Sequence, residues 1–301
     1  MVVLWNASAG WNHDSEEATH VLEMLSESGA PLEFEQIWKG QDITAASRTF
    51  MSRRPKILVA AGGDGTLNAV ASAVVNTRHV LGVIPAGTLN HLARDLAIPL
   101  SAEEAAASML EGHEIQIDVG AANNRFFLNN SVIGLYPFYR KSRDAYERRG
   151  LGANFITRCI AVFRSFARTI WRLPQHDLRL TFDDGSPVEV RTAFVLIANN
   201  DHELEHWNLG HRESLDDGHL WVYILKRSTR WSMLRFFLRF VFKRFSRHEA
   251  FHIFKARSIR VESRASSLKV GLDGEIARLE TPLEYRSLPR ALRVMAPAKD
   301  G

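Results

Sequence analysis

The first third of the chain alternates short apolar runs with segments whose apolar residues recur at helical spacing. Ala18, Val21 and Leu25 recur every three or four positions, which is typical of a helix with one buried face. Strands that alternate with helices predict an α/β domain with a parallel sheet. The expected strands are residues 2–5, 32–38, 56–60 and 79–84, and the expected helices are 16–28, 43–51, 91–96 and a helix that follows an N-cap at Ser101 and ends at Leu110.

Strand-like segments dominate after about residue 115. They are expected at residues 114–119, 125–129, 178–182, 188–197, 219–225, 258–262, 267–272 and 275–280. Residues 183–187 and the pair Asp273-Gly274 have compositions typical of hairpin turns. We therefore expect an α/β domain at residues 1–120 and a mainly antiparallel β domain at 121–284. Whether the tail, 285–301, packs back on the first domain stays open.

Composition narrows the class of protein and its surroundings. The 301 residues are 46% apolar, which is ordinary for a globular protein with two cores. The pI near 9.3 indicates an anionic partner surface. Cys159 is the only cysteine, which excludes a disulfide framework and a cysteine-based zinc site and indicates a reducing compartment. The N-terminus lacks the pattern of a signal peptide, and no run reaches the roughly 20 apolar residues of a spanning helix. We expect a cytoplasmic protein, soluble or bound to a membrane from one side.

A glycine turn follows the expected strand at 56–60 and leads into an alanine-rich helix. Its sequence is Gly62-Gly63-Asp64-Gly65-Thr66. Glycines there let main-chain N–H groups approach a phosphate, and the helix N-terminus adds a favourable dipole. Asp64 is well placed to hold magnesium or to orient a water beside it. A tight turn without a ligand is the alternative.

The next expected strand also ends in a glycine-threonine turn, which runs from Pro85 through Gly87 and Thr88 to Asn90. Ligands of open parallel sheets bind at the carboxyl ends of the strands, so Thr66 and Thr88 are candidates for phosphate or nucleobase contacts. Asn68 and Asn90 are candidates for fixing the two loops. The lysine motif of P-loop enzymes is absent from the sequence.

Three motifs in order resemble the diacylglycerol kinase catalytic-domain superfamily, and most closely its short bacterial lipid kinases. They are residues 62–68, residues 85–96 and the late Leu272-Asp273-Gly274-Glu275. The resemblance runs from Asn6 to about residue 280. It implies a nucleotide-binding α/β domain, a C-terminal antiparallel β-sandwich domain, and a cleft between them where ATP meets a lipid hydroxyl.

The resemblance also assigns roles to residues. It implies Mg²⁺ at Asp64, and a second, structural Mg²⁺ held by the Asp217 carboxylate and the carbonyls of Ser214 and His219. For residues 216–218 a plain β-turn is the alternative. It implies Glu275 or Asp273 as the base that takes the proton of the lipid hydroxyl. The expected nucleotide contacts are Asn6, Ser8, Gly10, Thr44 (or its neighbours Asp42 and Ile43), Gly62, Gly63, Gly65, Thr66, Asn68, Gly87, Thr88 and Asn90.

His91 departs from the family pattern. The family often has an aspartate after the asparagine of the second motif, and a neutral imidazole supplies no negative charge for magnesium or its waters. Either a water network substitutes or the chain is a weakened kinase.

Two other features bear on the partners. His202-Glu-Leu-Glu-His206 matches a zinc-protease motif, but Gly210 ends any helix too early and the extended motif is missing, so no zinc is expected. The segment 226–247 carries a cationic stripe of Arg235, Arg239, Lys243 and Arg247, and residues 140–172 are a weaker copy. Such helices can lie on an anionic membrane, although packing on the core is the alternative. No base-reading motif points to nucleic acid.

The best interpretation is an ATP- and Mg²⁺-dependent lipid kinase, peripherally bound to the membrane, that phosphorylates a hydroxyl of a diacylglycerol-like or sphingoid lipid. One alternative is an enzyme similar to NAD kinase or phosphofructokinase, which acts on soluble substrates. The other is a catalytically weak lipid-binding regulatory protein.

Overall fold

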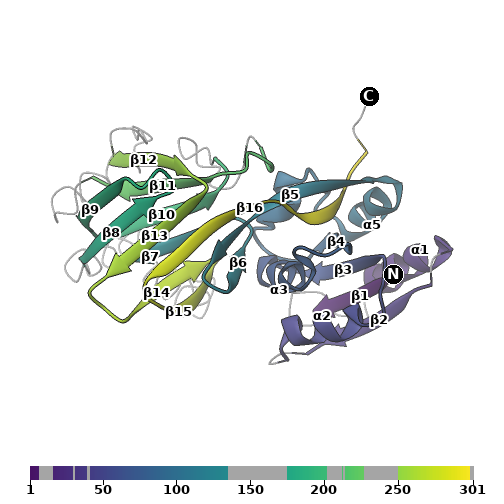
Figure 1. Ribbon diagram of the computed structural model, residues 1–301. Helices are drawn as coiled ribbons and strands as arrows, with labels where there is room; N and C mark the ends of the chain where they lie inside the picture. Colours follow the sequence, from purple (N-terminus) through teal and green to yellow (C-terminus); the bar gives the residue numbers. More distant parts are fainter. Residues whose placement is uncertain are drawn as a thin grey trace, which may run out of the picture.

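The computed structural model describes residues 1–6, 16–29, 31–38, 41–134, 175–201, 212, 214–226 and 250–298. In this part of the chain the strands form two sheets, one of ten strands and one of six. Figure 1 shows two lobes, an α/β lobe built from the N-terminal third and a β lobe built from most of the rest.

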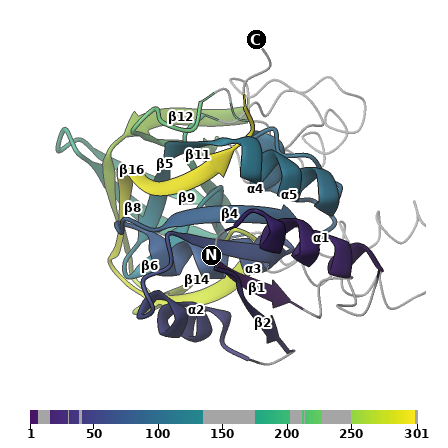
Figure 2. The ribbon, with the colours of Figure 1, turned by 90° about the vertical axis from the view of Figure 1, so that its right-hand side faces the viewer.

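The α/β lobe has a parallel sheet in the order β2-β1-β3-β4. Its strands are β1 (Val2–Asn6), β2 (Glu33–Ile37), β3 (Ile57–Gly62) and β4 (Val80–Pro85). Its helices are α1 (Glu16–Glu27), α2 (Ile43–Met51), α3 (Asp64–Val74), α4 (His91–Asp95) and α5 (Ala102–Glu111). Val3 and Trp5 belong to the core that includes residues of α1 and α5, whereas Val2 and Leu4 belong to the core that includes residues of α2 and α3. Figure 2 shows the sheet of this lobe with its helices around it. Helices on both faces explain why β1, β3 and β4 are almost continuously apolar, whereas the edge strand β2 alternates.

The β lobe is antiparallel and packs one sheet on the other. The six-stranded sheet has the order β12-β11-β10-β7-β14-β15, and β13, β8 and β9 extend the ten-stranded sheet opposite it. Apolar side chains from both sheets form one core, which includes Phe127, Val222 and Tyr285. The strands are β5 (His113–Ala122), β6 (Arg125–Phe127), β7 (Asn130–Gly134), β8 (His176–Phe182), β9 (Pro187–Thr192), β10 (Phe194–Asn199), β11 (Leu220–Leu225), β12 (Phe251–Ala256), β13 (Ser258–Ser263), β14 (Ser267–Leu272) and β15 (Glu275–Glu280).

The last strand, β16 (Leu283–Ala296), belongs to both lobes. Its first part pairs with β13, its whole length follows β5, and its end pairs in parallel with β4. Tyr285 is fully buried in the core of the β lobe, and Leu292 is fully buried in the core of the α/β lobe. The ten-stranded sheet is therefore continuous through the whole molecule.

The predicted class, parallel α/β followed by antiparallel β, is confirmed. One predicted strand is wrong, because residues 188–197 form β9 in one sheet and β10 in the other. The chain changes sheets at the buried residue Ala193, and its apolar pattern shows no break there. Strands β7, β12 and β16 were not predicted. Within the described ranges, no helix has the length and apolar character needed to cross a bilayer.

Leu292→Ala tests whether β16 is part of the core of the α/β lobe. Removing a fully buried leucine leaves a cavity, so the free energy of unfolding should fall by about 2–5 kcal/mol. Arg286→Ala, at an exposed position of the same strand, should change it by less than about 0.5 kcal/mol. Urea titrations of both variants measure the difference, and equal small effects would remove β16 from that core.

Candidate active site

Two glycine turns lie against each other at the carboxyl ends of β3 and β4. Gly63 is the N-cap of α3, and a Cβ atom on Gly87 would lie 2.7 Å from its Cα atom. A Cβ atom on Gly62 would lie 2.6 Å from Thr66 Oγ1. Asn6, at the end of β1, donates from Nδ2 to the same hydroxyl at 2.7 Å. Only glycine allows the two turns this close approach, and the N-terminus of α3 begins at the first of them.

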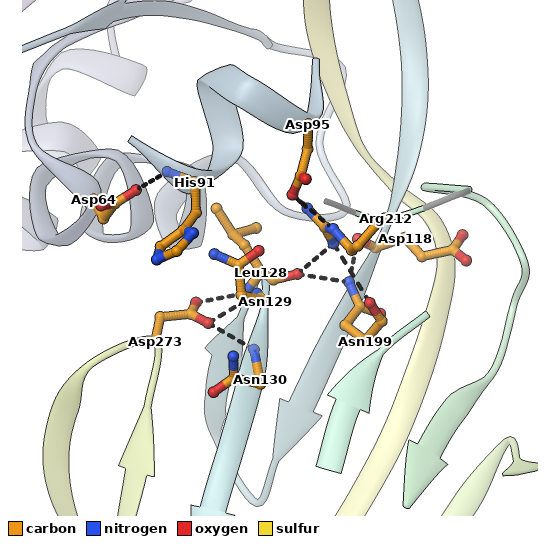
Figure 3. A network of polar contacts seen from close by, with 10 residues as sticks. All are labelled: Asp64, His91, Asp95, Asp118, Leu128, Asn129, Asn130, Asn199, Arg212 and Asp273. Atoms are coloured by element: carbon orange, nitrogen blue, oxygen red, sulfur yellow. Dashed lines mark hydrogen bonds and ion pairs between the residues drawn. The ribbon is translucent and has the colours of Figure 1, made fainter. Parts of the chain in front are cut away.

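The Asp64 carboxylate fixes the second turn to the first. Its oxygens accept the N–H groups of Asn90 at 3.0 Å and of His91 at 2.7 Å, at the start of α4. Figure 3 shows the bond from His91. The Asn90 side chain closes its own turn, because it both accepts from Gly87 N and donates to Gly87 O at 2.9 Å. Asp64 thus orients α4 through main-chain groups that any residue at positions 90 and 91 would supply.

An open cleft of about 510 Å³ lies beside these turns. This volume is in the usual range for a small-molecule site. Its lining combines the phosphate-loop residues, the start of α2 and two charged side chains from the β lobe. The lining residues are Asn6, Gln41, Asp42, Ile43, Thr44, Gly63, Gly65, Thr66, Ala69, Arg125 and Glu275.

Among the residues that the structure describes, the other expected nucleotide residues do not line the cleft. Gly62, Gly87 and Asn90 form the supporting turns, Thr88 is exposed beside them, and Asn68 is half-buried on α3. Ser8 and Gly10 lie outside the described residues, as do the histidine motif at 202–206 and the basic segments at 140–172 and 227–247.

Glu275 and Arg125 carry opposite charges into the cleft from the β lobe. Glu275 is exposed at the start of β15, and a methyl group on Gly65 would lie 3.3 Å from its Oε1 atom. This places the carboxylate beside the first glycine turn, at the start of α3. Arg125 begins β6 and is also exposed. Arg125 could not be recognised from the sequence, because a lone arginine after a turn belongs to no motif.

Asp273, two residues before Glu275, has a different environment. Its buried carboxylate accepts three main-chain N–H groups, from Leu128 at 2.5 Å, Asn129 at 2.8 Å and Asn130 at 2.9 Å (Figure 3). Burial raises the pKa of Asp273 above its ordinary value, while these donors favour the ionised form. A carboxylate occupied in this way ties the β14–β15 hairpin to the turn before β7.

A buried ion pair links α4 to that same turn. Arg212 Nε donates to Asp95 Oδ2 at 2.8 Å, and Nη1 donates to Leu128 O at 2.8 Å. Both side chains of the ion pair are almost completely buried, at 1% and 0% exposure. Burial raises the pKa of Asp95, and the Arg212 charge opposes this shift. The sequence did not suggest that Asp95 and Arg212 form a pair, because 117 positions separate them.

The candidate site for a structural metal is occupied by a lysine. Asp217 accepts from Lys255 Nζ at 2.9 Å and from Trp221 Nε1 at 3.0 Å. Although partial burial works against it, these contacts lower the pKa of Asp217 below its ordinary value. The His219 ring lies 2.7 Å from the Asp217 carbonyl oxygen, and the Ser214 hydroxyl donates to Asp216. A cation bound to Asp217 would lie beside the positive charge of Lys255, which disfavours it. The role of these residues as metal ligands stays a prediction.

Within the described ranges, no group of three or more His, Cys, Asp and Glu side chains is arranged to hold a metal. The Asp64 carboxylate nevertheless fits a nucleotide-bound magnesium. Each of its oxygens accepts one N–H group and keeps a further lone pair. Magnesium in kinase sites is commonly held by one or two carboxylates together with substrate phosphates.

Comparison with known proteins assigns the class. Residues 1–122 match the family described as the diacylglycerol kinase catalytic domain, and residues 154–296 match the YegS C-terminal NAD kinase beta sandwich-like domain. The two-lobed fold with its glycine-loop cleft is therefore that of a kinase, a phosphotransferase. The chain is thus similar to the diacylglycerol kinase catalytic domain over its first 122 residues, and to proteins named diacylglycerol kinase over nearly its whole length.

Individual relatives agree with this assignment. Proteins named diacylglycerol kinase from two strains of Staphylococcus aureus, bovine RF122 / ET3-1 and MRSA252, are each 26% identical over 300 residues, with 98% of this chain and 91% of the relative covered. The crystal structure of a diacylglycerol kinase from Bacillus anthracis has the same fold, with a TM-score of 0.70 at 21% identity, covering 98% of this chain and 96% of that one. An NAD kinase from Archaeoglobus fulgidus, solved with ATP, is more distant, with a TM-score of 0.52 at 12% identity over 99% and 94% of the two chains.

Asp273→Asn separates a structural carboxylate from a chemical one. Asparagine tolerates the left-handed backbone at this position (φ 43°), so the change isolates the carboxylate. Each N–H donor left without a partner should lower the free energy of unfolding by about 1–3 kcal/mol. Glu275→Gln, at an exposed position of the same hairpin, should change it by less than about 0.5 kcal/mol. Chemical denaturation of both variants measures this contrast, and an unchanged midpoint for Asp273→Asn would contradict the anchoring role.

Proposed function

We propose that this kinase transfers the γ-phosphoryl group of ATP to a hydroxyl of a diacylglycerol-like or sphingoid lipid, with Glu275 as the base. The single observation that carries the proposal is the position of the Glu275 carboxylate against Gly65. One acidic side chain from the β lobe reaches the loop on which the triphosphate is expected to bind. A hydroxyl between them would be within reach of both the base and the γ-phosphorus.

In this proposal the phosphates lie on the N–H groups of the Gly63–Thr66 loop at the start of α3. The lipid oxygen forms a bond to the γ-phosphorus, the bond from that phosphorus to the bridging oxygen breaks, and ADP leaves. The hydroxyl proton passes to Glu275. Positioning and charge neutralisation supply most of the rate enhancement in such a transfer.

Magnesium is the metal that the family implies, and Asp64 is the residue that would hold it together with phosphate oxygens. When bound, the metal neutralises charge on the β- and γ-phosphates. Arg125 supplies a second positive charge to the lining of the cleft. Because the guanidinium donates in a fixed planar fork, it suits a phosphate group better than lysine would.

Two exposed apolar side chains support a lipid acceptor over a soluble one. Ile276 follows Glu275 directly and is 42% exposed, and Leu89 precedes Asn90 in the second glycine turn and is also 42% exposed. Large apolar side chains on the two segments that carry the site suit contact with acyl chains or a membrane surface. A site for NAD or a sugar phosphate has no need of them.

An acceptor panel tests the proposed reaction. The chain should transfer phosphate from labelled ATP to diacylglycerol or a sphingoid base in phosphatidylglycerol vesicles, and not to NAD or fructose 6-phosphate. Glu275→Gln should lower the rate at least about 100-fold, since a positioned base contributes at least that much.

Transfer only to soluble acceptors would refute the lipid assignment. Vesicle binding without any turnover would support the regulatory alternative. A total lipid extract in place of the pure lipids would identify the acceptor from its labelled product.

Arg125→Gln tests the phosphate contact from the β lobe. Loss of a charge-assisted hydrogen bond to a phosphate should raise the KM for ATP about tenfold or more. The matched control is Arg278→Gln on β15, because Arg278 contacts Ser267 and does not line the cleft. Steady-state kinetics against ATP concentration compare the two variants, and an unchanged KM for Arg125→Gln would remove this residue from the nucleotide site.

A further inference from the structure

The hairpin that carries Glu275 lies at the edge of its sheet. Strand β15 is the last strand of the six-stranded sheet, and β14 pairs with its inner neighbour β7 at only three positions. These three pairs lie next to the tip, and the Asp273 N–H group extends them by donating to Asn130 O at 3.0 Å. Catalytic groups must stay within about 0.5 Å of the productive geometry. Contacts from outside the sheet add to this pairing.

Contacts of the hairpin lead from Glu275 to the buried ion pair. The Asp273 carboxylate holds the N–H group of Leu128, and the carbonyl oxygen of the same Leu128 accepts from Arg212. Asn199 Nδ2 also donates to this carbonyl at 2.9 Å, so the oxygen is shared by two buried donors. One peptide segment thus connects the arginine to the aspartate of the hairpin tip.

On its other side, Arg212 reaches the phosphate loop through α4. Asp95 is the last residue of α4, and the N–H groups of its first residue, His91, and of the preceding Asn90 donate to Asp64. Helix α4, which is about one and a half turns long, lies between the Asp64 and Asp95 carboxylates. The contacts therefore close a ring, from Asp64 through α4, Asp95, Arg212, Leu128 and Asp273 to Glu275, which returns to Gly65 beside Asp64. Figure 3 shows most of this ring.

We infer that Arg212 and Asp95 are positioning residues, which set the distance between Glu275 and the phosphate loop. This inference rests on the proposed role of Glu275 as the base. The fork of Arg212 is suited to this task, because its Nε and Nη2 atoms face Asp95 while Nη1 faces Leu128 O. No other charged contact among the described residues joins α4 to the turn before β7.

A double substitution separates positioning from stability. Asp95→Leu together with Arg212→Met replaces the buried ion pair by apolar side chains of similar size, a change that commonly leaves stability intact. It also removes the hydrogen bond to Leu128 O. In the full chain, with diacylglycerol in phosphatidylglycerol vesicles, kcat should fall about tenfold or more, because a small misplacement of a reacting group has an effect of this size. The KM for ATP should stay within about twofold of the parent value.

Two further variants keep the test decisive if the double variant does not fold. Arg212→Lys keeps a positive charge beside Asp95 but cannot reach Leu128 O at the same time, so it should show the same loss of kcat at unchanged KM. Arg260→Met is the matched control, because it breaks an ion pair with Glu284 at a half-exposed position of β13. Its kcat should equal that of the parent.

The outcomes separate this inference from the proposed function. A double variant with a parental melting temperature and a kcat within about twofold of the parent would overturn the positioning role. So would a loss of kcat that only follows a fall in melting temperature. If Glu275→Gln is fully active, the proposed base is wrong and the inference fails with it. If Glu275→Gln is inactive and the double variant is fully active, only the inference fails. In the Glu275→Gln background the double substitution should cause no further loss.

Discussion

Strand β16 is the constraint on which the arrangement of the two lobes depends. A single strand of 14 residues contributes Tyr285 to one core and Leu292 to the other. Because a strand is stiff, fixing Tyr285 in one core limits where Leu292 can lie in the other. The lobes are also joined by β5, which follows β16 along its length. A cleft bordered by both lobes can therefore have a defined width before any ligand binds, which is the condition for a preorganised transfer site.

The strand changes direction where it passes from one lobe to the other, and a buried aspartate compensates for the lost pairing. Register shifts between Leu288 and Leu292, and Arg290 has a left-handed backbone (φ 52°). Asp118, which is 1% exposed, accepts the Arg290 N–H group at 2.8 Å and the Gly218 N–H group at 2.6 Å. The Arg290 N–H group lies where the pairing with β5 is interrupted, and the Asp118 carboxylate of β5 accepts its hydrogen bond instead.

Asp64, Asp118 and Asp273 share one physical role, since each accepts main-chain N–H groups of a segment distant in sequence. These contacts join residues that are far apart in the sequence, so local sequence patterns could not predict them. Helical spacing and apolar runs located most elements of the α/β lobe, because there the local pattern and the fold agree. The same reasoning missed β16, whose polar positions alternate irregularly as it passes between environments. It also could not decide whether Asp273 or Glu275 is the base, because the motif contains both acidic residues. Their burial, which depends on the turn before β7, distinguishes them.

The substitution of His91 for an aspartate changes less of the site than the sequence suggests. What position 91 provides to Asp64 is a main-chain N–H group, and this group is independent of the side chain. Asp64 is therefore oriented in this chain regardless of the imidazole. The charge lost with the aspartate is negative, and in the proposed site a triphosphate beside α3 would bring an excess of negative charge. Fewer fixed carboxylates, with Arg125 in the same cleft, would lower the repulsion that binding must overcome. On electrostatic grounds the histidine is therefore compatible with the proposed nucleotide site, and losing the aspartate would affect the water ligands of a bound magnesium more than the position of the phosphates.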